Sequence, residues 1–373
     1  MPDIILEGVT KCWGEVTAVD DLNLTIPDGS FMCLLGPSGC GKTTTLRMIA
    51  GLEESDKGRI LMDNKVIYSS ERCFSLEPNK RNVGLIFQSY ALWPHMTVFQ
   101  NIAFGLEMQN MDKKSIANRV KGISKWMKID NLLGRYPSEL SGGQQQRTAL
   151  ARSLAPQPSC ILMDEPLSNL DAKLRVEMRI ELKRLHSETH QTILYVTHDQ
   201  VEALSLGTQL AVMNEGRLQQ IGEPLQVYTY PNNLFVAEFV GSHTINMLKG
   251  IINRKKDRWI VKCGELSFSL EKTKKIFDGQ KVRVCIRPED VILNSSKPVD
   301  SSKFTVYSIQ PTGPDILARV RRGDIFLTAR MIERTILPLE TEVDVDFQPG
   351  RLLLFDEKTG QRIAKTNICF IRN

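Results

Sequence analysis

An apolar run that leads directly into a glycine-rich loop constrains the fold of this 373-residue chain more than any other feature. Phe31–Leu35 is a short continuous apolar run, which is typical of a strand buried on both faces of a sheet. The loop that follows reads Gly36-Pro37-Ser38-Gly39-Cys40-Gly41-Lys42-Thr43, and a helical pattern begins at Thr44. The loop matches the phosphate-binding pattern Gly-x-x-x-x-Gly-Lys-Ser/Thr at every defined position. Strand, loop and helix in this order predict an α/β nucleotide-binding domain.

Each part of the loop has a chemical reason. Glycines let backbone N–H groups turn toward phosphate oxygens, and the start of the following helix adds partial positive charge. We expect Lys42 to reach the β- and γ-phosphates and the Thr43 hydroxyl to ligate Mg²⁺, with Thr44 also in the nucleotide site. The alternative is a glycine turn that precedes a lysine by chance, and the strand–loop–helix context argues against it.

A second apolar run ends in two carboxylates, in the sequence Cys160-Ile161-Leu162-Met163-Asp164-Glu165. An acidic pair after a strand is by itself most often a turn or a helix cap. With the phosphate-binding loop upstream, Asp164 is expected to hold the Mg²⁺ shell. Glu165, one residue later, is placed to act as general base on the attacking water.

A second helix start that could bind an anion lies at Ser141-Gly142-Gly143-Gln144, ahead of a helical run over residues 147–154. One such cradle is enough for a chain's own nucleotide. The second therefore implies either a second nucleotide or a sandwich with another copy of the chain.

Taken in order, these motifs resemble the ABC ATPase family over residues 3–240. Leu140-Ser141-Gly142-Gly143-Gln144 resembles its signature motif, and Phe87-Gln88-Ser89 resembles its Q-loop. Ser168-Asn169-Leu170-Asp171 resembles the D-loop, and Thr197-His198-Asp199 resembles the switch histidine. Trp13 resembles the aromatic residue that stacks on adenine.

The resemblance implies roles for these residues. ATP would lie between the phosphate-binding loop of one subunit and residues 141–144 of the other, in a two-fold, head-to-tail dimer. Asp171 would also belong to this nucleotide site. Gln88 would approach Mg²⁺ and the water, and His198 would contact the γ-phosphate. For His198 the alternative is an ordinary core or surface histidine, and for Trp13 it is a packed aromatic.

The pattern of the sequence changes after about residue 240, where short runs of alternating apolar and polar residues are separated by Gly, Pro and Asp turns. We therefore predict an α/β P-loop ATPase domain over 1–240, with a helical subdomain at about 89–155. An all-β, barrel-like domain is predicted over 241–373, and the resemblance given next implies that it is of oligonucleotide/oligosaccharide-binding type. The motif Ile286-Arg287-Pro288-Glu289-Asp290 resembles the C-terminal regulatory domain of maltose-type importers. Residues 367–373 fit no part of this resemblance.

Bulk properties are those of an ordinary cytosolic protein. The formal charge is +5, and the eight cysteines are scattered without a Cys-x-x-Cys pair, as expected of reduced structural thiols. The N-terminus has no signal-peptide pattern. Residues 82–106 lack Asp, Glu, Lys and Arg but include Gln88, His95 and Trp93-Pro94. That content predicts a core strand, a loop and a short helix rather than a membrane span, so membrane association would go through a partner.

These observations predict an importer ATPase with ATP and Mg²⁺ as cofactors, peripheral on the cytoplasmic face of the membrane. Its expected partners are a second copy or a related ATPase subunit, two membrane permease subunits and, indirectly, an extracytoplasmic solute-binding protein, with no nucleic acid. The segment after Gln88, with Trp93-Pro94, is either the docking groove for the permease or buried core. A sugar is the favoured solute, with polyamine, ferric ion and sulfate as alternatives. A soluble ABC ATPase acting on nucleic acid or ribosomes, or a regulatory module, are rival hypotheses.

Overall fold

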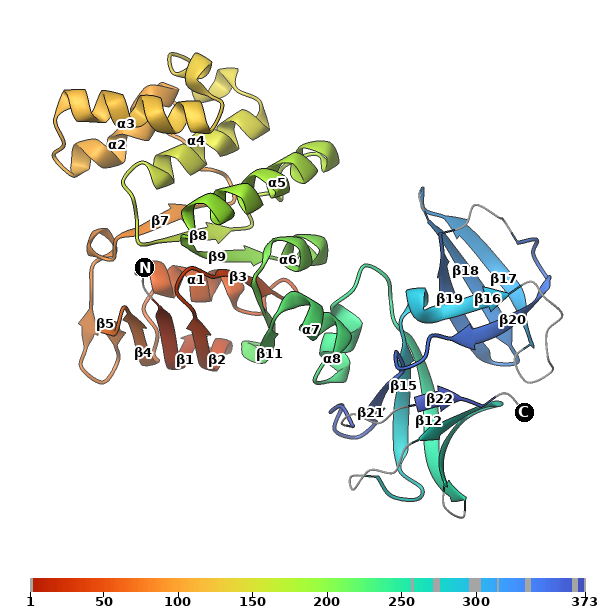
Figure 1. Cartoon of the computed structure of the whole chain (residues 1–373). Helices are drawn as coiled ribbons and strands as arrows, with labels where there is room; N and C mark the ends of the chain where they lie inside the picture. The colour runs from red at the N-terminus through yellow and green to blue at the C-terminus, as the bar shows by residue number, and fades with distance from the viewer. Residues whose placement is uncertain are drawn as a thin grey trace. The chain divides into compact units, whose positions relative to one another are not determined.

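The computed structural model describes residues 3–255, 258–270, 276–294, 303–313, 315–332, 337–363 and 368–371. The chain divides into two compact units, Met1–Leu225 and Gln226–Asn373 (Figure 1). This division falls before the boundary that we predicted at residue 240. The helices α7 (Pro224–Thr229) and α8 (Leu234–Phe239) fall largely in the second unit, because Arg287 donates to the carbonyls of Tyr228 and Val240.

The first unit is built on a six-stranded sheet in the order β11-β10-β3-β9-β8-β7. Every pair in it is parallel except the β10–β11 pair. The strands are β3 (Phe31–Leu35), β7 (Val83–Ile86), β8 (Cys160–Asp164), β9 (Thr192–Thr197), β10 (Gln209–Asn214) and β11 (Arg217–Gly222). All residues of β3, β8 and β9 are buried, which is why these strands appear as continuous apolar runs. The carboxyl ends of β3, β9, β8 and β7 meet at one edge of the sheet.

A second, antiparallel sheet has the order β2-β1-β4-β5-β6. Its strands are β1 (Ile4–Trp13), β2 (Val16–Ile26), β4 (Lys57–Met62), β5 (Lys65–Ser69) and β6 (Phe74–Ser75). Helix α1 (Lys42–Ala50) shares one apolar core with both sheets, formed by side chains such as Ile4, Leu46, Ile49 and Leu194. The helix that follows the phosphate-binding loop is therefore held on both sides.

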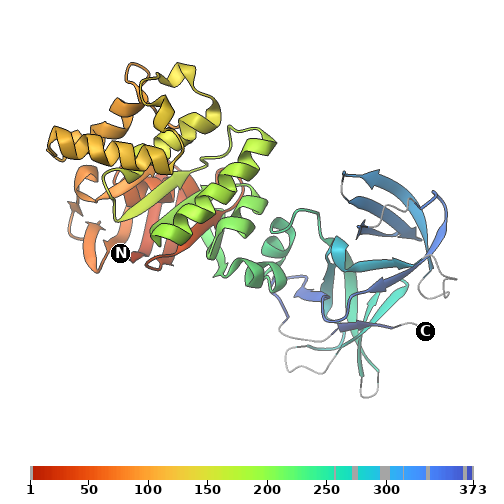
Figure 2. The ribbon, with the colours of Figure 1, turned by 45° about the horizontal axis from the view of Figure 1, so that its top comes forward.

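Three helices form a separate group in the first unit: α2 (Val98–Met108), α3 (Lys113–Trp126) and α4 (Gly142–Leu154). Figure 1 shows them gathered away from β1 and β2, and Figure 2 turns this group toward the viewer. Short 3₁₀ turns at Pro78–Lys80, Asp130–Leu132 and Pro137–Glu139 connect these parts. Two further helices, α5 (Ala172–Thr189) and α6 (Gln200–Leu206), follow β8 and β9. Within the described residues, no helix is both long and apolar enough to cross a membrane.

The second unit carries two antiparallel sheets with the orders β21-β15-β12-β13-β14-β22 and β16-β20-β17-β18-β19. Their strands are β12 (Asn246–Lys255), β13 (Arg258–Cys263), β14 (Leu266–Leu270), β15 (Lys281–Ile286), β16 (Val291–Asn294), β17 (Lys303–Pro311), β18 (Ile316–Arg322), β19 (Ile325–Met331), β20 (Glu342–Phe347), β21 (Leu353–Asp356) and β22 (Ile368–Phe370), with a 3₁₀ turn at Pro288–Asp290. Both sheets face one apolar core that includes Phe268, Phe304 and Phe347. The predicted all-β domain is thus present, and β22 lies in the segment that fitted no part of the family resemblance.

Candidate functional site

The phosphate-binding loop leaves the end of β3 and closes on the start of α1. Gly39 and Gly41 have φ values of 80° and 97°, which side chains other than hydrogen rarely allow. A Cβ on Gly41 would also overlap the Ala18 carbonyl oxygen of β2. Lys42 is buried, and its Nζ donates to the carbonyls of Gly36 (2.8 Å) and Pro37 (2.9 Å). The loop therefore wraps around the lysine ammonium, in a shape that fits a cradle for phosphate.

Thr43 and Asp164 meet although 121 residues separate them in the sequence. The Thr43 hydroxyl donates to Asp164 Oδ1 at 2.8 Å, which ties α1 to the end of β8. Burial raises the pKa of the Asp164 carboxyl, and the Thr43 hydrogen bond opposes that rise. Mg²⁺ is usually held by one or two carboxylates together with substrate phosphates. An oxygen pair of this kind, beside the cradle, fits that donor set.

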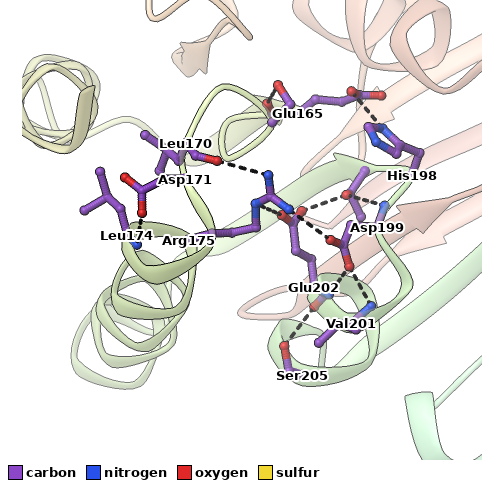
Figure 3. Close-up of polar contacts among 12 residues, drawn as sticks. Glu165, Leu170, Asp171, Leu174, Arg175, His198, Asp199, Val201, Glu202 and Ser205 are labelled. Atoms are coloured by element: carbon purple, nitrogen blue, oxygen red, sulfur yellow. Dashed lines mark hydrogen bonds and ion pairs between the residues drawn. The ribbon is translucent and has the colours of Figure 1, made fainter. Parts of the chain in front are cut away.

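Glu165 lies one residue beyond Asp164 with a φ of 44°, an unusual backbone conformation for a glutamate. Its Oε2 lies 2.9 Å from His198 Nδ1, at the end of the neighbouring strand β9 (Figure 3). The His198 side chain is 54% exposed and that of Glu165 is 20% exposed. His198 is therefore not a core residue. Left-handed backbone at a polar strand end is a recurrent feature of functional sites.

Gln88 is joined to the segment after Glu165 by two side-chain bonds. Gln88 Nε2 donates to Ser168 Oγ at 3.3 Å, and Asn169 Nδ2 donates to the Gln88 carbonyl at 3.0 Å. Ser168 in turn donates to the carbonyl of Glu165. We did not predict Ser168 and Asn169 as site residues. The D-loop-like motif Ser168-Asn169-Leu170-Asp171 contains both and was the signal that could have identified them.

The residues of the second glycine cradle lie at the start of α4. Ser141 Oγ accepts from the Gln144 backbone N–H, and Gln144 Oε1 accepts from that of Ser141 at 2.9 Å, which forms a capping box. A Cβ on Gly143 would lie 2.7 Å from Cδ1 of Leu174 in α5, so the Leu174 side chain packs directly on the α4 backbone there. Asp171 similarly caps α5 through Leu174. These two helix ends make hydrogen bonds within themselves, whereas Lys42, Thr43, Asp164, Glu165, Gln88 and His198 gather at the sheet edge.

Trp13 ends β1 and is 51% exposed. The Lys11 ammonium lies 4.7 Å from the centre of its ring. A packed core aromatic would be buried, so this ring has a face free for another partner. The next strand, β2, reaches the phosphate-binding loop through Ala18 and Gly41.

Comparisons with known proteins identify the relatives of this chain. The family model described as "ABC transporter" matches residues 19–168. The trehalose/maltose import ATP-binding protein MalK of Thermococcus litoralis is 43% identical over 376 residues, covering 97% of this chain and 100% of that protein. The sn-glycerol-3-phosphate import ATP-binding protein UgpC of Escherichia coli O6:K15:H31 is 42% identical over 364 residues, with the same coverage. The ABC transporter ATP-binding protein YurJ of Bacillus subtilis is 40% identical over 372 residues.

Solved structures resemble the ATPase part. A dimeric ATP-binding cassette in a post-hydrolysis state, bound to ADP and Pi, has a TM-score of 0.52 and 30% identity, covering 59% of this chain and 98% of that one. The protein cbiO1 of Clostridium perfringens, part of an ABC transporter complex, has a TM-score of 0.55 and 28% identity, covering 61% of this chain and 90% of that one.

Proposed function

This chain belongs to the ABC transporter ATP-binding proteins, and on that premise we propose how its site uses MgATP and what it serves. It is the ATP-binding and ATP-hydrolysing subunit of an importer. The observation that supports this most strongly is similarity to import ATP-binding proteins along 97% of the chain, the β unit included. A soluble ABC protein acting on nucleic acid or ribosomes would not be expected to share that unit.

The phosphate-binding loop, residues 36–43, would hold the β- and γ-phosphates, with Lys42 as the cation and Thr44 beside them. Thr43, Asp164 and Gln88 would hold Mg²⁺. When bound, Mg²⁺ would supply positive charge against the phosphates and so neutralise charge that develops during hydrolysis. The 2.8 Å contact between Thr43 and Asp164 supports this role, because both oxygens are already side by side. Trp13 would stack on the adenine.

Glu165 would take a proton from the attacking water as general base. His198 would orient the Glu165 carboxylate through the 2.9 Å contact and approach the γ-phosphate. Gln88 would position the water, since its bond to Ser168 holds it beside the same segment. These roles need the three side chains at one sheet edge, which is where they lie.

Residues 141–144 and Asp171 would complete the site of a second copy. The Gln144 N–H is used in the capping box, and the Gly142 and Gly143 N–H groups at the start of α4 would face an anion from outside the subunit. A relative of the ATPase part was solved as a dimer bound to ADP and Pi. A head-to-tail dimer is the arrangement in which both glycine cradles of each chain are used.

The membrane partner would dock beside the Q-loop. A groove of about 840 Å³ lies there, lined by residues that include Phe87, Ala91, Trp93, Phe104 and Met108. Met108 is 65% exposed and Phe87 is 37% exposed, so apolar side chains face outward. Each copy of the chain in a dimer would offer one such groove, and an amphipathic helix from one of the two permease subunits would fit each groove. The chain would then sit on the cytoplasmic face as a peripheral subunit, and a solute-binding protein would act on the far side.

The solute would be a sugar or a related sugar phosphate, as the names of the relatives above indicate for those proteins. Ferric ion, polyamine and sulfate are the alternatives. The test is uptake of labelled maltose, trehalose and glycerol 3-phosphate by the source cell carrying Glu165→Gln in place of the wild-type chain. Loss of uptake of one of them, with ferric, polyamine and sulfate uptake intact, supports the proposal. Loss of ribosome or nucleic-acid function with every uptake intact contradicts it.

A further inference from the structure

Arg175, in the first turn of α5, lies between two motifs of the site (Figure 3). Its Nη2 donates to the Leu170 carbonyl at 3.1 Å, so it holds the end of the D-loop-like segment, residues 168–171. The side chain is 32% exposed, so the guanidinium is partly withdrawn from solvent. This arginine belongs to none of the motifs that identified the site.

The other side of the guanidinium faces two carboxylates of the turn after β9. Nη1 lies 3.7 Å from Asp199 Oδ2, and Nε lies 3.9 Å from Glu202 Oε1. Both distances are those of ionic contacts rather than direct hydrogen bonds. Among the described residues, Nε has no hydrogen-bond partner although it is buried. The guanidinium is therefore held by one carbonyl and attracted to two acids.

Glu202 is a buried anchor for this contact. Its Oε2 accepts from the hydroxyls of Tyr195 (2.9 Å) and Thr197 (2.7 Å), and only 3% of the residue is exposed. Burial raises the pKa of this carboxyl, whereas the two hydroxyls and Arg175 oppose the rise. A buried acid needs such partners to remain charged.

Asp199 is the neighbour of His198 in the chain and is itself firmly held. Its Oδ1 accepts from the backbone N–H of Val201 (2.8 Å) and Glu202 (3.1 Å), which caps α6, and its own N–H donates to Thr197 Oγ1. His198 thus lies in the chain between Thr197 and Asp199, which both bond within the Glu202 cluster. The backbone on both sides of the imidazole is therefore held by this cluster.

We propose that Arg175 is a positioning residue for ATP hydrolysis, which fixes the Leu170 carbonyl against the Asp199 and Glu202 carboxylates and so sets His198 against Glu165. The proposal rests on the roles proposed above for Glu165 and His198. A planar fork bonds a carbonyl and faces two carboxylates at once, which a lysine ammonium cannot do in the same geometry. Arg175→Lys should therefore keep the charge but not the positioning.

The test is steady-state ATP hydrolysis by the full chain, with kcat and KM measured separately. Arg175→Ala should lower kcat by about tenfold to a hundredfold, since small misplacements at a site have effects of this size. KM for ATP should change by less than about twofold, because the phosphate-binding loop is untouched. Arg175→Lys should give an intermediate kcat. Arg184→Ala is the matched control. Arg184 lies on the same helix, and among the described residues its one ion pair is with Glu188.

A second measurement separates positioning from general damage. In a His198→Ala background, Arg175→Ala should lower kcat by less than about twofold, since residues that act through one another are not additive. The proposal would be overturned if the kcat losses of Arg175→Ala and His198→Ala multiplied fully in the double variant. It would also be overturned if Arg175→Ala raised KM and left kcat unchanged, or if Arg175→Ala and Arg175→Lys had the same kcat as Arg184→Ala. Arg175→Lys serves alone if Arg175→Ala does not fold. A wild-type chain without ATPase activity would instead contradict the proposed function.

Discussion

The Thr43 hydroxyl donates to Asp164 Oδ1 across 2.8 Å and so joins the helix after the phosphate-binding loop to the end of β8. The contact places two hard oxygen donors side by side. Burial raises the pKa of the Asp164 carboxyl, and the hydrogen bond from the Thr43 hydroxyl opposes that rise.

Asp164→Asn should raise the Mg²⁺ concentration needed for half-maximal ATPase activity by about tenfold or more, a typical loss for a group that supports a metal site. Because the pKa of the Asp164 carboxyl is raised, a larger share of it carries a proton as pH falls, and Mg²⁺ must compete with that proton in the wild type. Apparent Mg²⁺ affinity should therefore fall with decreasing pH, and the asparagine variant should lose this component. Mg²⁺ titrations at several pH values check it, with the exposed Asp130→Asn as control. If apparent Mg²⁺ affinity depended on pH in the same way in all three proteins, Asp164 would be excluded as a group that holds Mg²⁺.

Lys42→Ala should weaken ATP binding by about tenfold to a hundredfold, which corresponds to the loss of charge-assisted hydrogen bonds. The Lys42 ammonium lies inside the loop, bonded to the Gly36 and Pro37 carbonyls, so its removal leaves the cradle without its cation. Equilibrium binding of a fluorescent ATP analogue measures the effect. Lys113→Ala, an exposed change at the start of α3, should bind as the wild type does. Unchanged affinity in Lys42→Ala would remove the phosphate-binding assignment.

Trp13→Ala should weaken ATP affinity by about fivefold to a hundredfold, as stacking of a base on an aromatic ring contributes roughly 1–3 kcal/mol. Trp13→Phe should keep much of the affinity because a smaller ring still stacks. ATP should also quench part of the tryptophan fluorescence in the wild type and in Trp259→Phe, but not in Trp13→Phe. If quenching persists without Trp13, the adenine lies elsewhere.

Much of the ATPase unit follows from local sequence. Phe31–Leu35 and Cys160–Asp164 were recognisable because strands buried on both faces are continuously apolar. The β1–β2 hairpin, Ile4–Trp13 and Val16–Ile26, is harder to recognise from the sequence. Its register shifts between Leu6 and Val9 and again near Lys11, which breaks the alternation that marks a strand.

Long-range contacts could not be read from the sequence. Motif order indicated that Gln88 and the D-loop-like segment belong to one site, but only the fold shows that Ser168 and Asn169 hold Gln88. Arg175 gave no local signal at all, because its partners Asp199 and Glu202 come from a different helix. The division between the two units lies before the predicted residue 240 for a similar reason. The Arg287 contacts with the carbonyls of Tyr228 and Val240 depend on folding of the β unit.

Asp290, buried in the 3₁₀ turn after Arg287, should make the second unit's stability depend on pH. Burial, with the nearby Glu289, raises the pKa of Asp290 to about 6, against an ordinary value of 3.8. The folded state therefore holds a proton that the unfolded chain releases, so this contribution is present below about pH 4 and is lost as pH rises through about 6. Asp290→Asn keeps the volume without the charge.

Urea unfolding of wild type and Asp290→Asn from pH 4 to pH 7 tests this dependence. The variant should gain stability relative to the wild type as pH rises, whereas the exposed Asp324→Asn should follow the wild type throughout. A constant difference between Asp290→Asn and wild type over that range would show that Asp290 does not titrate there.

ATP retention by the Glu165→Gln protein, measured after rapid removal of free nucleotide, tests most directly whether MgATP is hydrolysed in a site shared by two copies. Glu165→Gln removes the general base and puts a neutral amide of nearly the same shape in its place. ATP should therefore bind and be retained without being hydrolysed. Adding Ser141→Arg, which blocks the start of α4, should abolish retention while ADP affinity stays as in wild type. Retention that survives Ser141→Arg, or hydrolysis by Glu165→Gln at the wild-type rate, would contradict the shared site and its base.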